Sequence, residues 1–176
     1  NTSHYSPVKI ADFGTAYLMH ERNADPHRGK RVGSRGYSAP EVQRLEYGPP
    51  CDIWSMGVVL YCLLVGYLPF EEGFMQIVKI MTGSFEFHKE DWQDIHADAQ
   101  DLISKMLTVN AASRITAREV LEHPWLARLG DEEKTKTKEF DLNETQNRMK
   151  TFNMRRKFKA AAHATVAAGR AALDVA

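Results

Sequence analysis

The sequence predicts a mainly α-helical protein, and three observations carry that prediction. Residues 53–70 form an 18-residue stretch without charge, bounded by Asp52 and closed by Pro69 and Phe70. Two later segments, 74–82 and 98–108, place apolar residues at helical spacing. Residues 116–119 (Thr-Ala-Arg-Glu) have the spacing of a capping box before further apolar residues. Beyond residue 11 we therefore expect helices joined by loops.

Composition excludes several classes of protein. The 176 residues are 43% apolar and 26% charged, as in ordinary globular proteins, so a disordered chain, a collagen-like fibre and a disulfide scaffold are excluded. Cys51 and Cys62 would lie about 16 Å apart on one helix, too far for a disulfide. Free thiols predict a cytoplasmic or nuclear protein.

The formal net charge of zero hides an asymmetry. Residues 148–176 carry seven basic residues and one acid, a net charge of +6. The other 147 residues hold 16 basic and 22 acidic residues, a net charge of −6. An acidic body and a basic tail predict either that the tail binds its own body or that it binds an acidic partner.

The elements are expected in this order along the chain. Residues 8–10 alternate like a short strand, and 18–38 read as a long loop. A helix start at 38–41 and a break at 47–50 precede the apolar helix from 52 to 66. Its length is near the lower limit for a membrane span, but its Ser, Gly and Pro residues favour a buried core helix.

Two amphipathic helices follow at 74–82 and 98–108. In the second, Leu102, Ile103, Met106 and Leu107 share one apolar face. The helix that begins at Thr116 is expected to end at Pro124. A polar linker at 128–144 then leads into a basic amphipathic helix at 145–176.

Two short motifs are weak when taken alone. Asp12-Phe13-Gly14 could be a simple turn after a strand. Ser38 could be a helix N-cap, with Glu41 three residues later forming the reciprocal hydrogen bond of a capping box. The order in which these and later motifs occur is a much more specific signal. The chain carries Asp12-Phe13-Gly14 and, after 24 further residues, Ala39-Pro40-Glu41. Residues 52–57 (Asp-Ile-Trp-Ser-Met-Gly), Arg114 and 123–126 (His-Pro-Trp-Leu) follow. In this order, these motifs resemble those of the protein kinase family. The resemblance implies the helical C-lobe of that fold over residues 1–127.

The resemblance also implies residue roles. Asp12 would bind Mg²⁺ beside the phosphates of ATP, with Phe13 and Gly14 completing the turn. Ser34, Gly36 and Tyr37 would shape the substrate loop, although Arg35 replaces the usual Pro. Structural roles would fall to a buried Glu41–Arg114 ion pair, to Trp54 and to Asp52, which would hold the catalytic loop. An ordinary helix N-cap is the alternative for Asp52.

The tail resembles the regulatory segment of calcium/calmodulin-dependent protein kinase II. That family's helix blocks the substrate site until calmodulin removes it, which implies binding of this tail to its own kinase lobe and to calmodulin. The implied calmodulin-binding residues are Phe152, Arg155, Arg156, Lys157, Phe158 and Lys159. Thr145 occupies the autophosphorylation position, but Leu142 stands where a basic residue would mark it as a substrate. The alternatives are a solvated basic helix and a helix on an anionic membrane.

Further alternatives are less well supported. The basic run belongs to no nucleic-acid recognition motif, and the histidines and cysteines have no zinc spacing. No Gly-rich loop, strand lysine or His-Arg-Asp loop precedes Asp12, so the N-lobe and the catalytic residues are expected outside this chain. Either the chain is part of a serine/threonine kinase that acts on protein substrates, and is inactive alone, or it is a truncated, non-catalytic module that binds calmodulin or a kinase.

Overall fold

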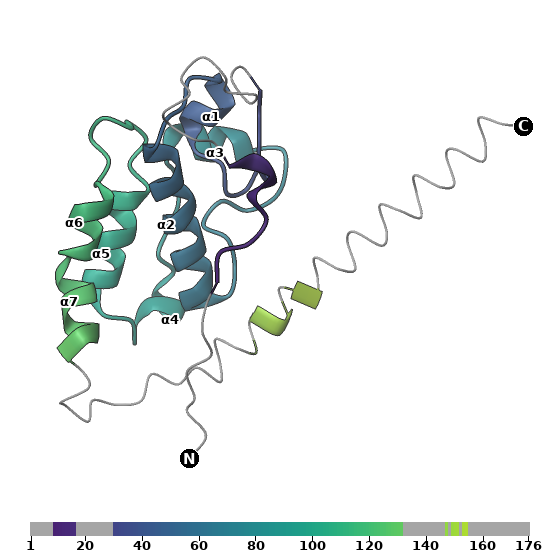
Figure 1. The fold of residues 1–176 in the computed structure, drawn as a ribbon. Helices are drawn as coiled ribbons and strands as arrows, with labels where there is room; N and C mark the ends of the chain where they lie inside the picture. The colour runs from purple at the N-terminus through teal and green to yellow at the C-terminus, as the bar shows by residue number, and fades with distance from the viewer. Residues whose placement is uncertain (1–8, 17–29, 132–146, 148, 152, 155–176) are drawn as a thin grey trace, which may run out of the picture.

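The computed structural model describes residues 9–16, 30–131, 147, 149–151 and 153–154, and these residues are helical with no strand among them (Figure 1). The predicted mainly α fold is therefore confirmed. A 3-10 helix, η1 (Phe13–Thr15), precedes the α-helices. These are α1 (Pro40–Arg44), α2 (Pro50–Val65), α3 (Gln76–Thr82), α4 (Lys89–Trp92), α5 (Ala97–Met106), α6 (Ala117–Leu121) and α7 (Pro124–Asp131).

The strand expected at 8–10 is not found where the structure describes it. Val8 lies outside the described residues, whereas Lys9 and Ile10 belong to no strand. Ile10 is 86% exposed. A strand is defined by the ladder it forms with a neighbour, and the described residues supply none. The prediction of a strand over Lys9 and Ile10 was therefore wrong.

Helix α2 forms the centre of the fold (Figure 1). It begins at Pro50, two residues earlier than expected, because prolines suit the first turn of a helix, where an amide hydrogen is not needed. It ends at Val65 and is followed by Gly66, whose φ of 83° lies in the left-handed region open to glycine. No helix among the described residues is long and apolar enough to cross a membrane. Ile53, Trp54, Gly57, Val58, Tyr61, Cys62 and Val65 of α2 are buried, so the predicted core helix is confirmed.

Helix α5 packs closely against α2 at Gly57. A Cβ atom placed on Gly57 would lie only 2.8 Å from the Cβ of Met106 and 3.1 Å from Leu107. The predicted apolar face of α5 is confirmed, because its four residues are all at most 3% exposed. Glycine on α2 thus lets the two helices approach, and the apolar face of α5 fills the contact.

Two apolar clusters make up the core. The larger cluster surrounds Trp54 and Tyr61 of α2 and includes Phe70, Ile80 and Trp92. The indole of Trp54 stacks on Phe70 with ring centroids 5.4 Å apart. The smaller cluster joins α2 to α5 and α6 through Ile53, Leu102, Met106 and Val120. Both clusters include residues of α2, so this helix joins the two parts of the core.

The predicted capping box is present at the start of α6. The Thr116 hydroxyl accepts from the Glu119 amide at 3.3 Å, and the Glu119 carboxylate accepts from the Thr116 amide at 2.8 Å. The expected end at Pro124 was wrong. Helix α6 ends at Leu121, and Pro124 instead begins α7, since proline at a first helical position favours a new helix.

The chain after residue 131 is described only in part. Residues 147, 149–151 and 153–154 are helical. Met149 packs against the larger cluster, and its sulfur lies 4.0 Å from the Cys62 sulfur. Residues 128–131 of the predicted linker at 128–144 belong to α7, so the helix continues past the expected start of the linker. The rest of that linker and most of the predicted helix at 145–176 lie outside the described residues and stay predictions.

Candidate functional site

Asp12 sits in an unusual backbone conformation. Its φ of 63° and ψ of 73° are left-handed, a region that few residues other than glycine adopt. Its carboxylate accepts a hydrogen bond from the Gly14 amide at 3.4 Å and so caps η1. Asp12 is exposed, and Phe13 beside it is 68% exposed. The turn thus exposes the Asp12 carboxylate and the apolar ring of Phe13 on the surface of the described residues.

The segment from residue 33 to 38 is fixed to the helical core at several points. The Tyr37 amide donates to the Ser34 carbonyl at 2.9 Å, closing a turn. The Ser55 hydroxyl of α2 donates to the Tyr37 carbonyl at 3.0 Å. Gly36 is buried, and a Cβ there would lie 3.0 Å from Leu68 and 3.2 Å from Gln76. This loop is therefore held between α2 and the start of α3.

Ser38 does not cap α1. The residue before the helix is Ala39, which provides no side-chain cap. The Ser38 hydroxyl instead donates to the Val32 and Ser34 carbonyls, at 3.3 and 3.2 Å. The capping interpretation of the spacing from Ser38 to Glu41 was therefore wrong. Pro40 starts the helix, which leaves Ser38 free to close the preceding loop.

A buried ion pair joins α1 to the segment before α6. The Arg114 guanidinium donates to the two oxygens of Glu41 at 2.6 and 3.0 Å, although 73 residues separate them. Arg114 is 4% exposed and Glu41 8% exposed. Arg114 also donates to the carbonyls of Thr108 and Pro50, at 2.9 and 2.6 Å. Because the ion pair is bidentate and Arg114 also donates to backbone carbonyls, it holds α1 in a fixed position against the segment before α6.

The same guanidinium lies over the ring of Trp54, 5.2 Å from its centroid. Trp54 is fully buried, so the contact is shielded from water. Trp54 therefore links the ion pair to the main apolar cluster. Glu41 is thus anchored beside the larger apolar cluster.

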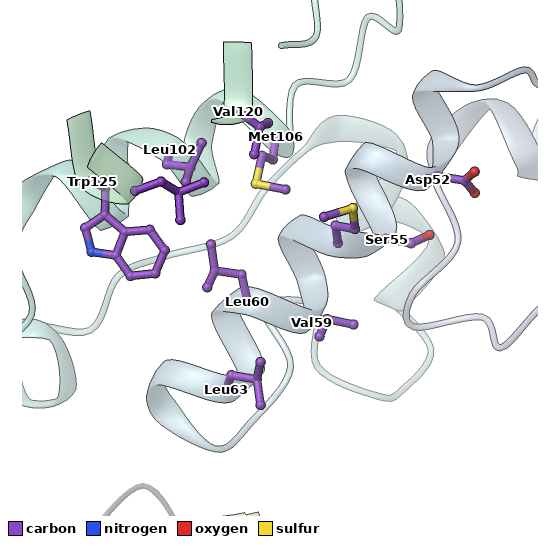
Figure 2. A pocket seen from close by; sticks show the side chains of 11 residues that line it. Asp52, Ser55, Val59, Leu60, Leu63, Leu102, Met106, Val120 and Trp125 are labelled. Carbon is purple, nitrogen blue, oxygen red and sulfur yellow. The ribbon is translucent and has the colours of Figure 1, made fainter. Parts of the chain in front are cut away.

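Asp52 does not act as a helix cap. Pro49 is the residue that precedes α2, so the capping alternative for Asp52 was wrong. Asp52 is exposed and lies at the rim of an apolar groove of about 480 Å³ (Figure 2). The groove is formed by α2, α5, α6 and α7 and is lined chiefly by Met56, Val59, Leu60, Leu63, Leu102, Met106, Val120 and Trp125. On α2, Met56, Val59 and Leu63 are 53%, 43% and 51% exposed.

No metal cluster or reactive thiol appears in the part of the chain that the structure describes. There, no group of three His, Cys, Asp or Glu side chains is placed to hold an ion. Cys51 and Cys62 form no disulfide. Burial, followed by the nearby Asp52 and Glu41 charges, raises the pKa of the Cys51 thiol to about 12. Cys51 is therefore protonated at neutral pH and is no nucleophile.

Sequence reasoning missed a second polar link. The buried His123 ring lies with Nε2 2.9 Å from Asp101 Oδ2, which also accepts from Lys105 Nζ at 2.6 Å. His123 Nδ1 accepts from the Trp125 amide at 3.3 Å. The spacing of these residues gave no signal, because Asp101 lies 22 positions before His123. The link holds α7 against α5.

The predicted tail residues lie outside the part that the structure describes. Thr145, Phe152, Arg155, Arg156, Lys157, Phe158 and Lys159 are therefore not placed. The described groups that remain define one unit: a turn with an exposed carboxylate, a loop fixed on a helical core, and a buried ion pair that closes the loop.

Comparison with known proteins identifies the class. Residues 1–126 match the protein kinase domain, so the chain belongs to the protein kinase family. It is 42% identical over 166 residues to the calcium/calmodulin-dependent protein kinase type II subunit delta of Oryctolagus cuniculus. That alignment covers 93% of this chain and 30% of the relative, so the chain spans about a third of its relative's length. The resemblance to the calcium/calmodulin-dependent kinases is thus confirmed.

Proposed function

We propose that the chain is the C-terminal part of the catalytic domain of a serine/threonine protein kinase, a transferase for protein substrates. The buried Glu41–Arg114 pair carries the proposal, because it fixes the end of the loop that starts at Asp12 to the helical core. Phosphoryl transfer depends chiefly on positioning, so a rigidly anchored substrate loop is the part such a lobe must provide.

Asp12 fits one position in a magnesium–ATP site. A hard cation takes oxygen ligands, and the exposed Asp12 carboxylate, held by its turn, offers one. Among the described residues, Asp12 belongs to no group of three His, Cys, Asp or Glu side chains that could hold an ion. Bound Mg²⁺ would offset the charge on the transferred phosphoryl group. Asp12 would therefore hold the metal together with residues outside this chain.

The chain alone is proposed to be inactive. The strand lysine and the His-Arg-Asp loop do not occur in the 176 residues. The apolar groove on α2, with Asp52 at its rim, would receive the missing part of the kinase domain. Until it does so, neither ATP nor a substrate hydroxyl is fully positioned.

A direct assay tests this proposal. The purified 176-residue chain is expected to transfer no phosphate from γ-labelled ATP to a peptide substrate. A longer protein that includes the upstream coding sequence should be active, and Asp12→Asn should abolish that activity while Asp94→Asn leaves it unchanged. Activity of the 176-residue chain, or an active Asp12→Asn variant, would contradict the proposal.

The basic tail is proposed to bind calmodulin and, in its absence, the kinase lobe. Its charge of +6 opposes a body of −6, and its bulky Phe158 and Phe152 suit an acidic, methionine-lined groove. Phosphorylation of Thr145 would release the tail by adding negative charge. We expect calcium-dependent retention on immobilised calmodulin that Phe158→Ala weakens and the surface variant Leu121→Ala does not. Equal retention without calcium would refute the assignment.

A second candidate is a non-catalytic module that binds calmodulin or a kinase. The open apolar groove on α2 favours it, since such a surface suits a partner helix. The upstream coding sequence separates the two candidates, because a kinase requires a strand lysine and a His-Arg-Asp loop there. In either case we propose a location in the cytoplasm or nucleus, where the thiols of Cys51 and Cys62, which form no disulfide, would stay reduced.

A further inference from the structure

Helix α3 has a second apolar face that does not point into the core. Phe74, Ile77, Val78 and Met81 follow one another at spacings of three, one and three residues, which places them on one side of a helix. Phe74, Ile77 and Val78 are 97%, 37% and 46% exposed, and Met81 is partly exposed. We refer to these four residues as the α3 stripe. A contiguous exposed apolar patch marks an interaction site more often than scattered apolar residues do.

Other residues of α3 hold the helix in the fold. Ile80 belongs to the larger cluster, and the buried Gln76 donates from its side-chain amide to the Phe70 carbonyl at 3.1 Å. The backbone amide of Gln76 donates to the Gly73 carbonyl at 3.2 Å, which closes the turn that carries Phe74. Attachment of α3 to the core therefore does not explain the α3 stripe, whereas a partner would.

The spacing of the α3 stripe is self-complementary. A twofold axis perpendicular to a helix makes the two copies of that helix run antiparallel. With the axis between residues 77 and 78, Phe74 would face Met81 of a second copy, and Ile77 would face Val78 of that copy. Each apolar side chain would then meet another apolar side chain, as an interface between identical surfaces requires.

The charges beside the α3 stripe are arranged in the same way. The stripe itself carries no charge, but Glu71 and Glu72 precede it and Lys79 lies within it. The Glu71 and Lys79 side chains are 76% and 39% exposed and pair at 3.2 Å within one copy. In the antiparallel arrangement, Lys79 of the second copy would lie level with Gln76, four residues from Glu72. Opposite charges would therefore meet across the contact, whereas a parallel arrangement would bring like charges together.

The small size of the α3 stripe indicates a weak contact. A standard interface buries about 800 Å² on each partner, from about 20–30 residues, and this stripe with its flanking charges offers fewer. Because both copies would use the same surface, association through it stops at two copies. The groove on α2 is a separate surface, since none of its lining residues belongs to α3.

We propose that two copies of this chain form a weak, reversible dimer in which the α3 stripes pack antiparallel. The dimer requires neither kinase activity nor calmodulin binding, so it stands apart from the proposed function. A Cβ on Gly36 would lie 3.2 Å from the side-chain nitrogen of Gln76, so α3 contacts the loop at residues 33–38. The second copy would therefore lie close to that loop.

Sedimentation velocity of the full 176-residue chain tests the dimer over about a hundredfold range of concentration. Val59→Lys and Leu63→Lys are present throughout, so that contact through the α2 groove does not contribute. The average mass should rise toward that of two chains and no further. Val78→Asp should raise the dissociation constant of the dimer at least about tenfold, because it places a charge in an apolar contact. The control Leu121→Asp, at a 75% exposed apolar residue of α6, should leave it unchanged.

Charge reversal tests the antiparallel arrangement without relying on Val78→Asp. Lys79→Glu alone, and Glu71→Lys combined with Glu72→Lys, should each weaken the dimer at least about threefold. An equimolar mixture of these two proteins should form a mixed dimer at least as tight as the original, because every charge then faces its opposite. A single-chain mass at every concentration would overturn the proposal. So would growth beyond two copies, a dimer that Val78→Asp does not weaken, or a mixture that associates no better than its components.

Discussion

Among single residues, Arg114 makes the most contacts that no local pattern could specify. It joins Glu41, three backbone carbonyls and the ring of Trp54 while almost fully buried. A buried ion pair adds little net stability compared with apolar residues, but the loss of one partner leaves the other charged and unpaired. Removing the Arg114 side chain is therefore expected to lower the free energy of unfolding.

We expect Arg114→Met to lower the free energy of unfolding by about 3–5 kcal/mol, because Glu41 would stay buried without its partner. Urea unfolding followed by circular dichroism measures the change. Lys105→Met is the matched control, since Lys105 pairs with Asp101 at 2.6 Å but is half exposed. Its cost should stay below about 1 kcal/mol. Equal losses in the two variants would show that the buried pair has no special role.

The contact between Asp101 and His123 predicts a pH dependence. Hydrogen bonds from Lys105 and then His123 lower the pKa of Asp101 below its ordinary value of 3.8. The folded state then binds fewer protons than the unfolded state, so the stability from Asp101 is present above about pH 4 and is lost as the pH falls through the lowered pKa. Because the carboxylate is 54% exposed, this contribution should be below about 1 kcal/mol.

Asp101→Asn should therefore reduce stability at neutral pH, and this loss should shrink as the pH falls below about 4 and through the lowered pKa of the wild-type carboxylate. Urea midpoints at neutral pH and at an acidic pH below that pKa measure this. The exposed Asp94→Asn serves as the control and should shift neither midpoint. A destabilisation by Asp101→Asn that is the same at both pH values would exclude titration of Asp101 as the cause.

Among the elements, the contact of α2 with α5 depends on Gly57. Alanine favours a helix interior over glycine by about 1 kcal/mol, so helix propensity alone predicts that Gly57→Ala is stabilising. The added Cβ would lie 2.8 Å from Met106 Cβ, closer than real contacts allow. We expect a net loss of about 1–3 kcal/mol from overpacking.

Thermal unfolding measures the effect of Gly57→Ala. Gly48→Ala is the control, because a Cβ there would lie 4.0 Å from the nearest atom of Pro50, an ordinary contact. Its midpoint should stay close to that of the wild type. A rise in the midpoint for Gly57→Ala would mean that α5 can move away without cost and that the helices are not tightly packed.

For the whole molecule, the groove on α2 should govern self-association. Its open face carries Val59 and Leu63, both about half exposed and unneeded for the core clusters. Val59→Lys combined with Leu63→Lys should lower light scattering by the purified chain, since apolar contact between copies is lost. Surface changes of this kind alter stability by about 0.5 kcal/mol or less each. Leu121→Lys, at a 75% exposed apolar residue of α6, is the control. Unchanged scattering in the double variant would exclude the groove as the contact.

Local chemistry allowed much of the fold to be predicted. The apolar face of α5 follows from helical periodicity, and the capping box of α6 follows from hydrogen bonds between residues three apart. Helix boundaries were less secure, because competing residues decide them. Prolines at 49 and 50 start α2 before Asp52 can cap it, and Pro124 begins a helix where an end was expected. The four-residue α4 had no pattern of its own and depends on burial of Trp92.

The sequence by itself determined the helical class, the order of the motifs and the opposed charges of body and tail, since these are properties of neighbouring residues and of composition. Only the tertiary structure decided which surfaces are covered. Arg114 and Glu41 meet across 73 positions, Met149 contacts Cys62, and Ile77 and Val78 of α3 are exposed while Gln76 of the same helix is buried. The physical reason is that the sequence pattern determines which face of a helix is apolar, whereas burial of that face depends on which other elements pack against it.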